Sequence, residues 1–203
     1  MVIELPISKS LANRLLILQA IHGDGLMTVS ACGVTDDARV VGCFDLPEDV
    51  QILHRALTTL HHSTQRYTTL NLSNCGTAMR FLTAYAAQLE NKVTVLDGVE
   101  RMHHRPIGQL VDALREIGAD IEYLGEEGFP PLRIKGCILD KHRIVTLNNP
   151  QSTQFVSALL LIGANVQTDS TSPYITLTRE IIDQYPIAHR ASNSPHGGRP
   201  IAA

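Results

Sequence analysis

Residues 74–80, with the sequence Asn-Cys-Gly-Thr-Ala-Met-Arg, have the residue types that bind anions at the start of a helix. They close a strand-like run and open an apolar helix. Gly76 allows a ligand close to the backbone, and the free N–H groups and dipole of the first helical turn favour negative charge. Thr77 adds a hydroxyl group and Arg80 a guanidinium group. An ordinary capped core helix is the alternative that this segment alone leaves open.

A second polar helix start lies near the N-terminus. Residues 8–14 read Ser-Lys-Ser-Leu-Ala-Asn-Arg and lead into a helix whose apolar residues recur every three or four positions. Lys9 and Ser10 lie in its first turn, and Arg14 follows Ser10 by four residues, so an ammonium, a hydroxyl and a guanidinium group can converge at one helix end. A solvated helix start is the alternative.

A third cationic helix start is formed by Arg105, which precedes Pro106. Proline suits the first helical position, and the pattern after it predicts a helix that ends before Gly118. The planar guanidinium group of Arg105 suits a phosphate or a carboxylate. The neighbouring His103 and His104 could bind an anion or a metal, but their side chains point in different directions, so we interpret them as loop residues.

A fourth polar helix start lacks charge. Ser152, Thr153 and Gln154 precede an apolar helix predicted over residues 155–162. Hydroxyl and amide groups suit the hydroxyl groups of a polar substrate, although capping alone explains Ser152. If the four helix starts converge, they form a site for a substrate with more than one anionic group.

The cysteines and the paired acids give weaker signals. The four cysteines are widely spaced and show no C-x-x-C pattern, which disfavours a zinc site and a disulfide framework. Cys75 is the exception to watch, because thiolate is favoured beside a helix N-terminus. The pair Asp36-Asp37 lacks a third ligand at suitable spacing, so turn and cap chemistry is favoured over a metal site.

Composition limits the function classes. The 203 residues are 44% hydrophobic and carry a formal net charge of −3, which is typical of a soluble globular protein and disfavours a nucleic-acid partner. The sequence contains no long apolar run and no signal-peptide pattern at its start, so no membrane partner is expected and the cytoplasm is the expected location.

The order of predicted elements is that of an α/β fold in which helices cover sheets. No low-complexity linker precedes residue 186, so residues 9–185 are expected to form one domain. The final residues 186–203 are rich in Pro, Gly, Ser and Arg and are expected to be a disordered tail, an expression remnant or a frameshifted end. The predicted strands are residues 2–6, 92–96, 120–124, 132–134, 144–147 and 173–177, and further helices are predicted at 47–60 and 178–185.

Four of these segments, in order along roughly residues 5–185, resemble 5-enolpyruvylshikimate-3-phosphate (EPSP) synthase, also called 3-phosphoshikimate 1-carboxyvinyltransferase. They are residues 8–14, 74–80, 97–107 and 152–155. The sister family, UDP-N-acetylglucosamine enolpyruvyl transferase, shares the fold but typically begins with a lysine–asparagine pair, whereas this chain has Lys9-Ser10. A non-catalytic anion-binding module is a further alternative.

The resemblance implies transfer of the enolpyruvyl group of phosphoenolpyruvate to the 5-hydroxyl of shikimate 3-phosphate, with no metal or organic cofactor. It implies that shikimate 3-phosphate contacts Lys9, Ser10, Arg14, Ser152, Thr153, Gln154 and Thr171. It implies that phosphoenolpyruvate contacts Lys9, Asn74, Gly76, Arg105 and Gln154. Cys75 replaces a usual alanine and Thr153 a usual serine, so the resemblance does not predict sensitivity to mimics such as glyphosate.

The resemblance also implies a domain of βαβαββ repeats, one of two that enclose the active site between them. This chain corresponds to about the first half, with residues 1–8 as a strand and crossover to the second domain. The acid–base aspartate and glutamate of the family fall in the other half, so no catalytic residue is assigned here. We therefore expect a monomeric half-site that does not turn over alone and needs the second domain.

Overall fold

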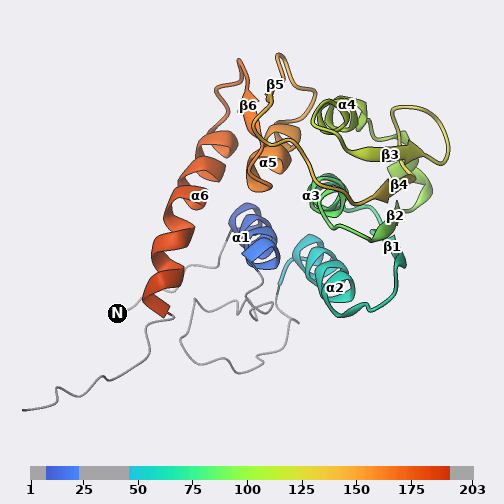
Figure 1. The fold of residues 1–203 in the computed structure, drawn as a ribbon, viewed down its shortest axis with the longest axis horizontal. Coiled ribbons are helices and arrows are strands. Elements are labelled where there is room, and N and C mark those ends of the chain that lie inside the picture. The colour runs from blue at the N-terminus through green and yellow to red at the C-terminus, as the bar shows by residue number, and fades with distance from the viewer. Residues whose placement is uncertain (1–7, 23–45, 193–203) are drawn as a thin grey trace, which may run out of the picture.

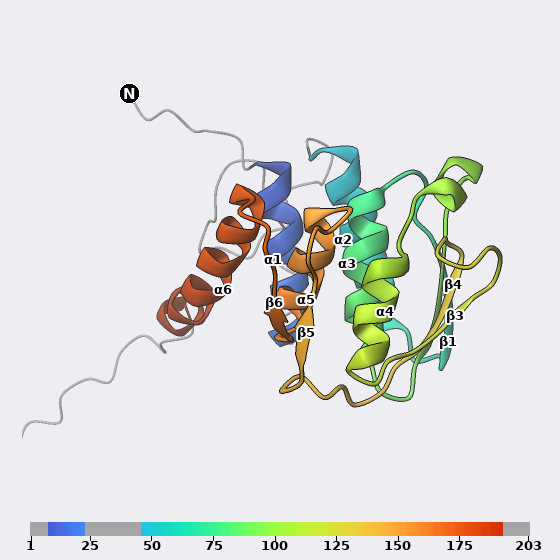
Figure 2. The same ribbon diagram turned by 90° about the horizontal axis from the view of Figure 1, so that it is seen from above.

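The computed structural model describes residues 8–22 and 46–192, with side chains up to residue 185, and shows a mixed α/β fold (Figure 1). Helices form one side of the molecule and the main sheet the other, so the sheet is covered on its inner face (Figure 2). The elements are α1 Lys9–His22, α2 Glu48–His62, β1 Tyr67–Asn71, α3 Gly76–Ala87, β2 Val93–Asp97, the 3₁₀ helix η2 Glu100–His104, α4 Gly108–Glu116, β3 Asp120–Tyr123, β4 Leu132–Lys135, β5 Ile144–Thr146, α5 Thr153–Leu161, β6 Asn165–Gln167 and α6 Pro173–Ser192.

The segment from β1 to β4 is one βαβαββ unit, as predicted. Its sheet has the strand order β1-β2-β4-β3, with β1 parallel to β2 and the other neighbours antiparallel. Leu70, Leu96 and Leu132 are register partners on successive strands, and all three are buried. Because side chains at paired positions lie on the same face, this row of leucines faces α3 and α4.

A second unit begins in the same way after β4. Strands β5 and β6 are parallel and are joined through α5, and α6 follows. Strand β6 was not predicted, because its three residues, Asn165–Gln167, give only one buried apolar side chain, Val166. The parallel pairs β1–β2 and β5–β6 each place a helix start after their first strand, and α3 and α5 pack against each other.

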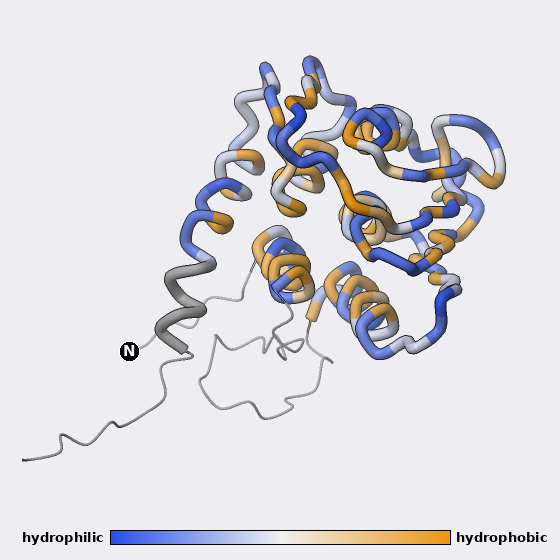
Figure 3. The backbone as a smooth tube through the Cα atoms, in the orientation of Figure 1, coloured by the Kyte–Doolittle hydropathy of each residue, from blue (hydrophilic) through white to orange (hydrophobic). Residues whose placement is uncertain are grey.

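Helix α1 contacts four other helices, α2, α3, α5 and α6. Its buried residues include Ala12, Leu16 and Ile17, which lie outside the apolar stripe expected from the sequence at Leu11, Leu15, Leu18 and Ile21, so the helix is buried on several sides. Figure 3 shows hydrophobic residues gathering where α1, α2, α3 and α5 meet, while the outer loops are largely hydrophilic. Phe81 and Phe155 are the largest fully buried side chains of this core.

The predicted strand at residues 173–177 is wrong, because these residues form the first turns of α6. Pro173 occupies the first helical position, and the Ser172 hydroxyl oxygen accepts a hydrogen bond of 3.3 Å from the Tyr174 backbone N–H. The buried residues Ile175, Thr178 and Ile181 recur every three positions, as on one face of a helix. The aromatic and β-branched residues that favour a strand here are overridden by this cap and by packing.

Other boundaries also differ from expectation. Helix α6 continues to Ser192, so the expected domain end at residue 185 lies inside a helix. Helix α4 begins at Gly108, so Pro106 lies before it. The predicted strand at residues 2–6 and the paired aspartates lie outside the described residues. Within the described ranges, none of the helices combines the length and apolar composition needed to cross a bilayer.

Candidate functional site

The predicted anion motif begins helix α3. Cys75 is its N-cap, and the Cys75 sulfur accepts a hydrogen bond of 3.3 Å from the Ala78 backbone N–H. The preceding turn contains Ser73 with a φ of 51°. The Ser73 carbonyl oxygen accepts a hydrogen bond of 3.1 Å from the Val99 backbone N–H, which joins the loop after β1 to the loop after β2. Because β1 and β2 are parallel, both loops leave the same edge of the sheet.

Two guanidinium groups flank Gly76. The Nη1 atoms of Arg80 and Arg105 each lie 2.5 Å from the point that a Cβ atom on residue 76 would occupy, so only glycine leaves them this position. Arg105 also donates a hydrogen bond of 3.2 Å to the carbonyl oxygen of Asn74. Burial, and then the charge of Arg105, lowers the pKa of Arg80. Neither arginine forms an ion pair with a carboxylate of the described residues.

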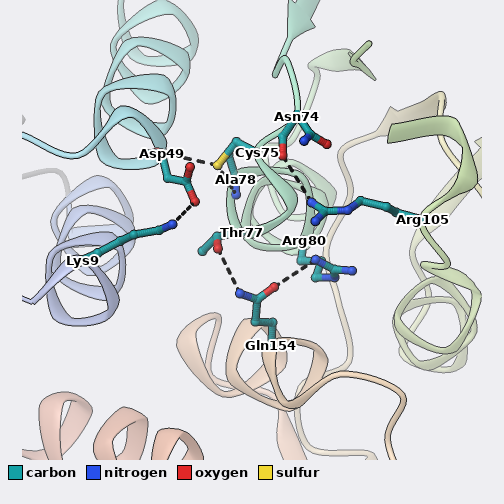
Figure 4. A network of polar contacts seen from close by, with 9 residues as sticks. All are labelled: Lys9, Asp49, Asn74, Cys75, Thr77, Ala78, Arg80, Arg105 and Gln154. Atoms are coloured by element: carbon teal, nitrogen blue, oxygen red, sulfur yellow. Dashed lines mark hydrogen bonds and ion pairs between the residues drawn. The ribbon is translucent and has the colours of Figure 1, made fainter. Parts of the chain in front are cut away.

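Gln154 connects this arginine pair to helix α5. Its amide nitrogen donates to the Thr77 hydroxyl at 2.9 Å, and its amide oxygen accepts from Arg80 at 3.0 Å (Figure 4). The side-chain oxygen of Ser152 caps α5 by accepting from the Gln154 backbone N–H at 3.3 Å, and Thr153 is the first residue of the helix. The starts of α3 and α5 are therefore joined, as the convergence hypothesis requires.

Lys9 brings the start of α1 to the same place. Its ammonium nitrogen lies 2.5 Å from a carboxylate oxygen of Asp49, in the first turn of α2. In Figure 4, Lys9, Thr77, Gln154 and Arg105 come from different segments and lie around the start of α3. The site thus combines an ammonium group, two guanidinium groups, and hydroxyl and amide groups at helix starts, which suits a ligand with several anionic groups.

Arg14 lies in the interior of the molecule. It is 3% exposed, and all five of its N–H groups donate to acceptors within the protein. Nε donates to Thr178, Nη1 to the carbonyl and hydroxyl oxygens of Ser10, and Nη2 to the Ser157 hydroxyl and the Tyr174 carbonyl. Burial lowers the pKa of Arg14 to about 10. In this arrangement the Arg14 guanidinium group has no free N–H donor for a ligand.

Comparisons with known proteins identify the family. The family model of EPSP synthase (3-phosphoshikimate 1-carboxyvinyltransferase) matches residues 2–195. The chain belongs to this family. A 3-phosphoshikimate 1-carboxyvinyltransferase of Bacteroides fragilis is 38% identical over 194 residues, which cover 90% of this chain and 42% of the relative. One of Paraburkholderia phytofirmans is 36% identical and covers 91% of this chain and 46% of that relative.

A solved structure confirms the fold. EPSP synthase from Acinetobacter baumannii superposes with a TM-score of 0.60 at 21% identity, over 86% of this chain and 42% of that one. The chain therefore spans less than half the length of the EPSP synthases that it matches. The family match also extends past the expected domain end at residue 185, into the segment expected to be a tail.

Burial opposes the thiolate that a helix N-terminus favours at Cys75. In this member of the EPSP synthase family, Cys75 is 2% exposed, and burial raises its pKa to about 11 despite hydrogen bonds from backbone N–H groups. The helix N-terminus favours a thiolate, but the loss of solvent outweighs that effect. Cys75 is therefore a neutral packing and capping residue in the folded chain.

This pKa predicts slow alkylation of Cys75. At pH 8 the folded chain should react with iodoacetamide at Cys75 about 100-fold more slowly than the urea-unfolded chain, because a rise of about two pKa units lowers the thiolate fraction by that factor. Peptide mapping by mass spectrometry measures the rate at each cysteine, and the half-buried Cys137 is the internal control. Equal rates at Cys75 in the folded and unfolded chains would contradict the assignment.

Some site features were not expected from the sequence. His103 belongs to η2 and contacts Asp97 at 2.7 Å, so it is held against the turn that leads to Arg105. Thr171 lies exposed in the loop between β6 and α6. The partners of Arg14 and the Lys9–Asp49 pair were missed; Ser157, a lone hydroxyl within the apolar run of α5, was the available signal for the Arg14 network.

Proposed function

We propose that this chain supplies one side of the active site for enolpyruvyl transfer from phosphoenolpyruvate to the 5-hydroxyl of shikimate 3-phosphate, with release of phosphate. The observation that carries the proposal is the pair Arg80 and Arg105, which flanks Gly76 without a carboxylate partner among the described residues. Two adjacent cations repel each other, and an anion between them relieves that repulsion. Membership of the EPSP synthase family supports phosphoenolpyruvate as this anion.

In this proposal, phosphoenolpyruvate lies against the start of α3. Arg105 and the backbone N–H of Gly76 hold its anionic groups, and Asn74 borders the site. Arg80, whose guanidinium group donates to Gln154, adds a second positive charge. The shikimate hydroxyl loses its proton and adds to C2 while C3 gains a proton. The tetrahedral intermediate then loses a proton from C3 as the bond from C2 to the phosphate oxygen breaks, which restores the double bond and releases phosphate. Fixed cations and helix-end amides stabilise the charge that develops on the phosphate as it leaves.

Shikimate 3-phosphate lies on the side of α5 and α1. In this proposal Gln154, which joins the starts of α3 and α5, contacts both substrates, and Lys9 contacts both from the start of α1. Ser152 and Thr153 present hydroxyl groups at the α5 start, where a phosphate is favoured by the helix dipole. Contacts by Ser10, Arg14 and Thr171 remain predictions. The five hydrogen bonds that Arg14 already makes within the protein favour a structural role for it over direct contact with the ligand.

We propose further that the chain alone does not convert the two substrates. The acid–base aspartate and glutamate that the family resemblance implies fall in the part of the relatives that this chain does not match. A partner domain must also cover the site, because water exclusion strengthens its electrostatic interactions. The cytoplasmic location and the monomeric state stay predictions.

Phosphate release measures this function. The chain with both substrates should release phosphate at the background rate, and mixing it with the C-terminal half of the Bacteroides fragilis relative should raise the rate at least 10-fold, an order-of-magnitude expectation for restored acid–base groups. An Arg105→Ala chain in the same mixture is the control and should return the rate to background. Family-like turnover by the chain alone would contradict the half-site. Titration of the chain with shikimate 3-phosphate separates failed assembly of the halves from failed substrate binding.

A further inference from the structure

Asp49 connects three of the helices that form the site. Its carboxylate contacts the Lys9 ammonium of α1 at 2.5 Å, and its backbone oxygen lies 3.7 Å from the Cys75 sulfur, which donates to it from the start of α3. The carboxylate also lies in the first turn of α2, where the helix dipole favours a negative charge. Asp49 is therefore held by its own helix while it contacts both neighbouring helix starts (Figure 4).

Lys9 needs such a partner to have a defined position. Its side chain is 51% exposed, and a lysine stem with four carbons loses much rotamer freedom when it binds. An ammonium group has three N–H donors, and the contact with Asp49 uses one side of it, so donors remain for a ligand. The ion pair itself contributes little to folding, because water screens the attraction between exposed charges.

We propose that Asp49 is a positioning residue that holds the Lys9 ammonium at the site before the substrate arrives. This inference rests on the proposed function for the identity of the ligand. Asp49 touches no reacting atom; it acts through Lys9, whose rotamer it selects, and so lowers the entropy lost on binding. The negative charge of Asp49 also weakens the attraction of the site for an anionic substrate. This effect is limited, because Lys9, Arg80 and Arg105 together leave the cluster cationic.

The test compares two acids in the same helical turn. Asp49→Asn removes the ion pair, whereas Glu48→Gln removes the same charge from an exposed neighbour that forms no ion pair within the described residues. Isothermal titration with shikimate 3-phosphate should show an affinity about 5- to 20-fold lower for Asp49→Asn and changed less than about 2-fold for Glu48→Gln. Asp49→Glu should recover part of the loss. Unchanged or tighter binding by Asp49→Asn, or an equal loss in Glu48→Gln, would overturn the proposal.

A double-mutant comparison assigns the effect to Lys9. In a Lys9→Gln chain, the further change Asp49→Asn should no longer lower the affinity, because the group that Asp49 positions is gone. A merely structural role would instead lower the affinity by the same factor in both backgrounds. Melting temperatures of all variants should agree within about 2 °C, as expected for an exposed ion pair.

A ligand-free measurement separates this inference from the proposed function. Carbon relaxation at the Lys9 Cε atom by NMR should show restricted motion in the unchanged chain and in Glu48→Gln, and free motion in Asp49→Asn. Equal motion in all three would overturn the positioning role. If the unchanged chain shows restricted motion but binds no shikimate 3-phosphate, the positioning of Lys9 stands while the proposed half-site fails.

Discussion

Replacing Arg14 by alanine should lower the free energy of unfolding by about 3 to 5 kcal/mol. The change removes a buried cation that joins three helices and leaves buried hydroxyl groups of Ser157 and Thr178 without their charged donor. It also removes the packing of the guanidinium group over the ring of Phe81, 5.6 Å away. Burial of this cation is unfavourable in itself, as its lowered pKa shows. Its five hydrogen bonds offset that penalty only while the guanidinium group and its acceptors are both present.

Urea denaturation followed by circular dichroism measures this loss. Arg55→Ala is the matched control, because Arg55 is exposed on α2 and its loss should change stability by less than about 0.5 kcal/mol. Arg14→Lys should keep the charge yet recover little stability, since an ammonium group cannot reproduce the planar fork of donors. If Arg14→Ala unfolds like the unchanged chain but no longer binds shikimate 3-phosphate, Arg14 is a ligand contact and its network is not structural.

Replacing Gly76 by alanine should weaken phosphoenolpyruvate binding about 100-fold, that is by about 2.7 kcal/mol, while the chain stays folded. The added methyl group would lie 2.5 Å from the Nη1 atoms of Arg80 and Arg105, so both guanidinium groups must move. They are the ends of flexible side chains, and alanine is the better helix former, so stability should change by less than about 1 kcal/mol. The geometry of the anion site should therefore suffer far more than the fold.

Titration with phosphoenolpyruvate measures this loss of affinity. The chain is first mixed with the C-terminal half of a relative and with saturating shikimate 3-phosphate. Gly125→Ala is the control, because its added methyl group would only reach ordinary contact with Pro131, at 3.5 Å, far from the site in sequence. Unchanged affinity for Gly76→Ala would show that Arg80 and Arg105 do not hold this ligand. A destabilised Gly76→Ala chain would show that the two side chains cannot move aside.

Local signals in the sequence predicted much of the fold and the residue types found at the starts of α3 and α5. The segment 74–80 combines glycine, a cap and an apolar helix within a few residues, so its structure depends on near neighbours, and the βαβαββ order follows from the alternation of such segments. Local signals gave the wrong prediction for residues 173–177, which begin α6. Their aromatic and β-branched side chains favour a strand, while the deciding observations, burial against α1 and α5, come from distant parts of the chain.

The contacts that the sequence could not predict are all long-range. The spacing of Ser10 and Arg14 predicted that their side chains can meet at one helix end, and they do, but it could not show that the remaining donors of Arg14 bond to residues of α5 and α6. Likewise, Lys9 and Asp49 belong to different helices, and only the packing of α1 against α2 makes them partners. A sequence motif therefore indicates which polar and charged groups a segment carries. The tertiary structure determines which of these groups remain available to a ligand.

The Arg14 network also has a consequence for the order of folding. The hydrogen bond from Arg14 to Thr178 joins residues separated by 164 positions. Contacts of such long separation form late, because closing a large loop loses entropy before any packing is gained. At about 5 to 20 residues per second, synthesis leaves α1 without its α6 partner for roughly 10 to 30 s. During that interval a helix that is buried on several sides in the folded chain is exposed, so we expect α1 to be the segment that chaperones bind on the ribosome.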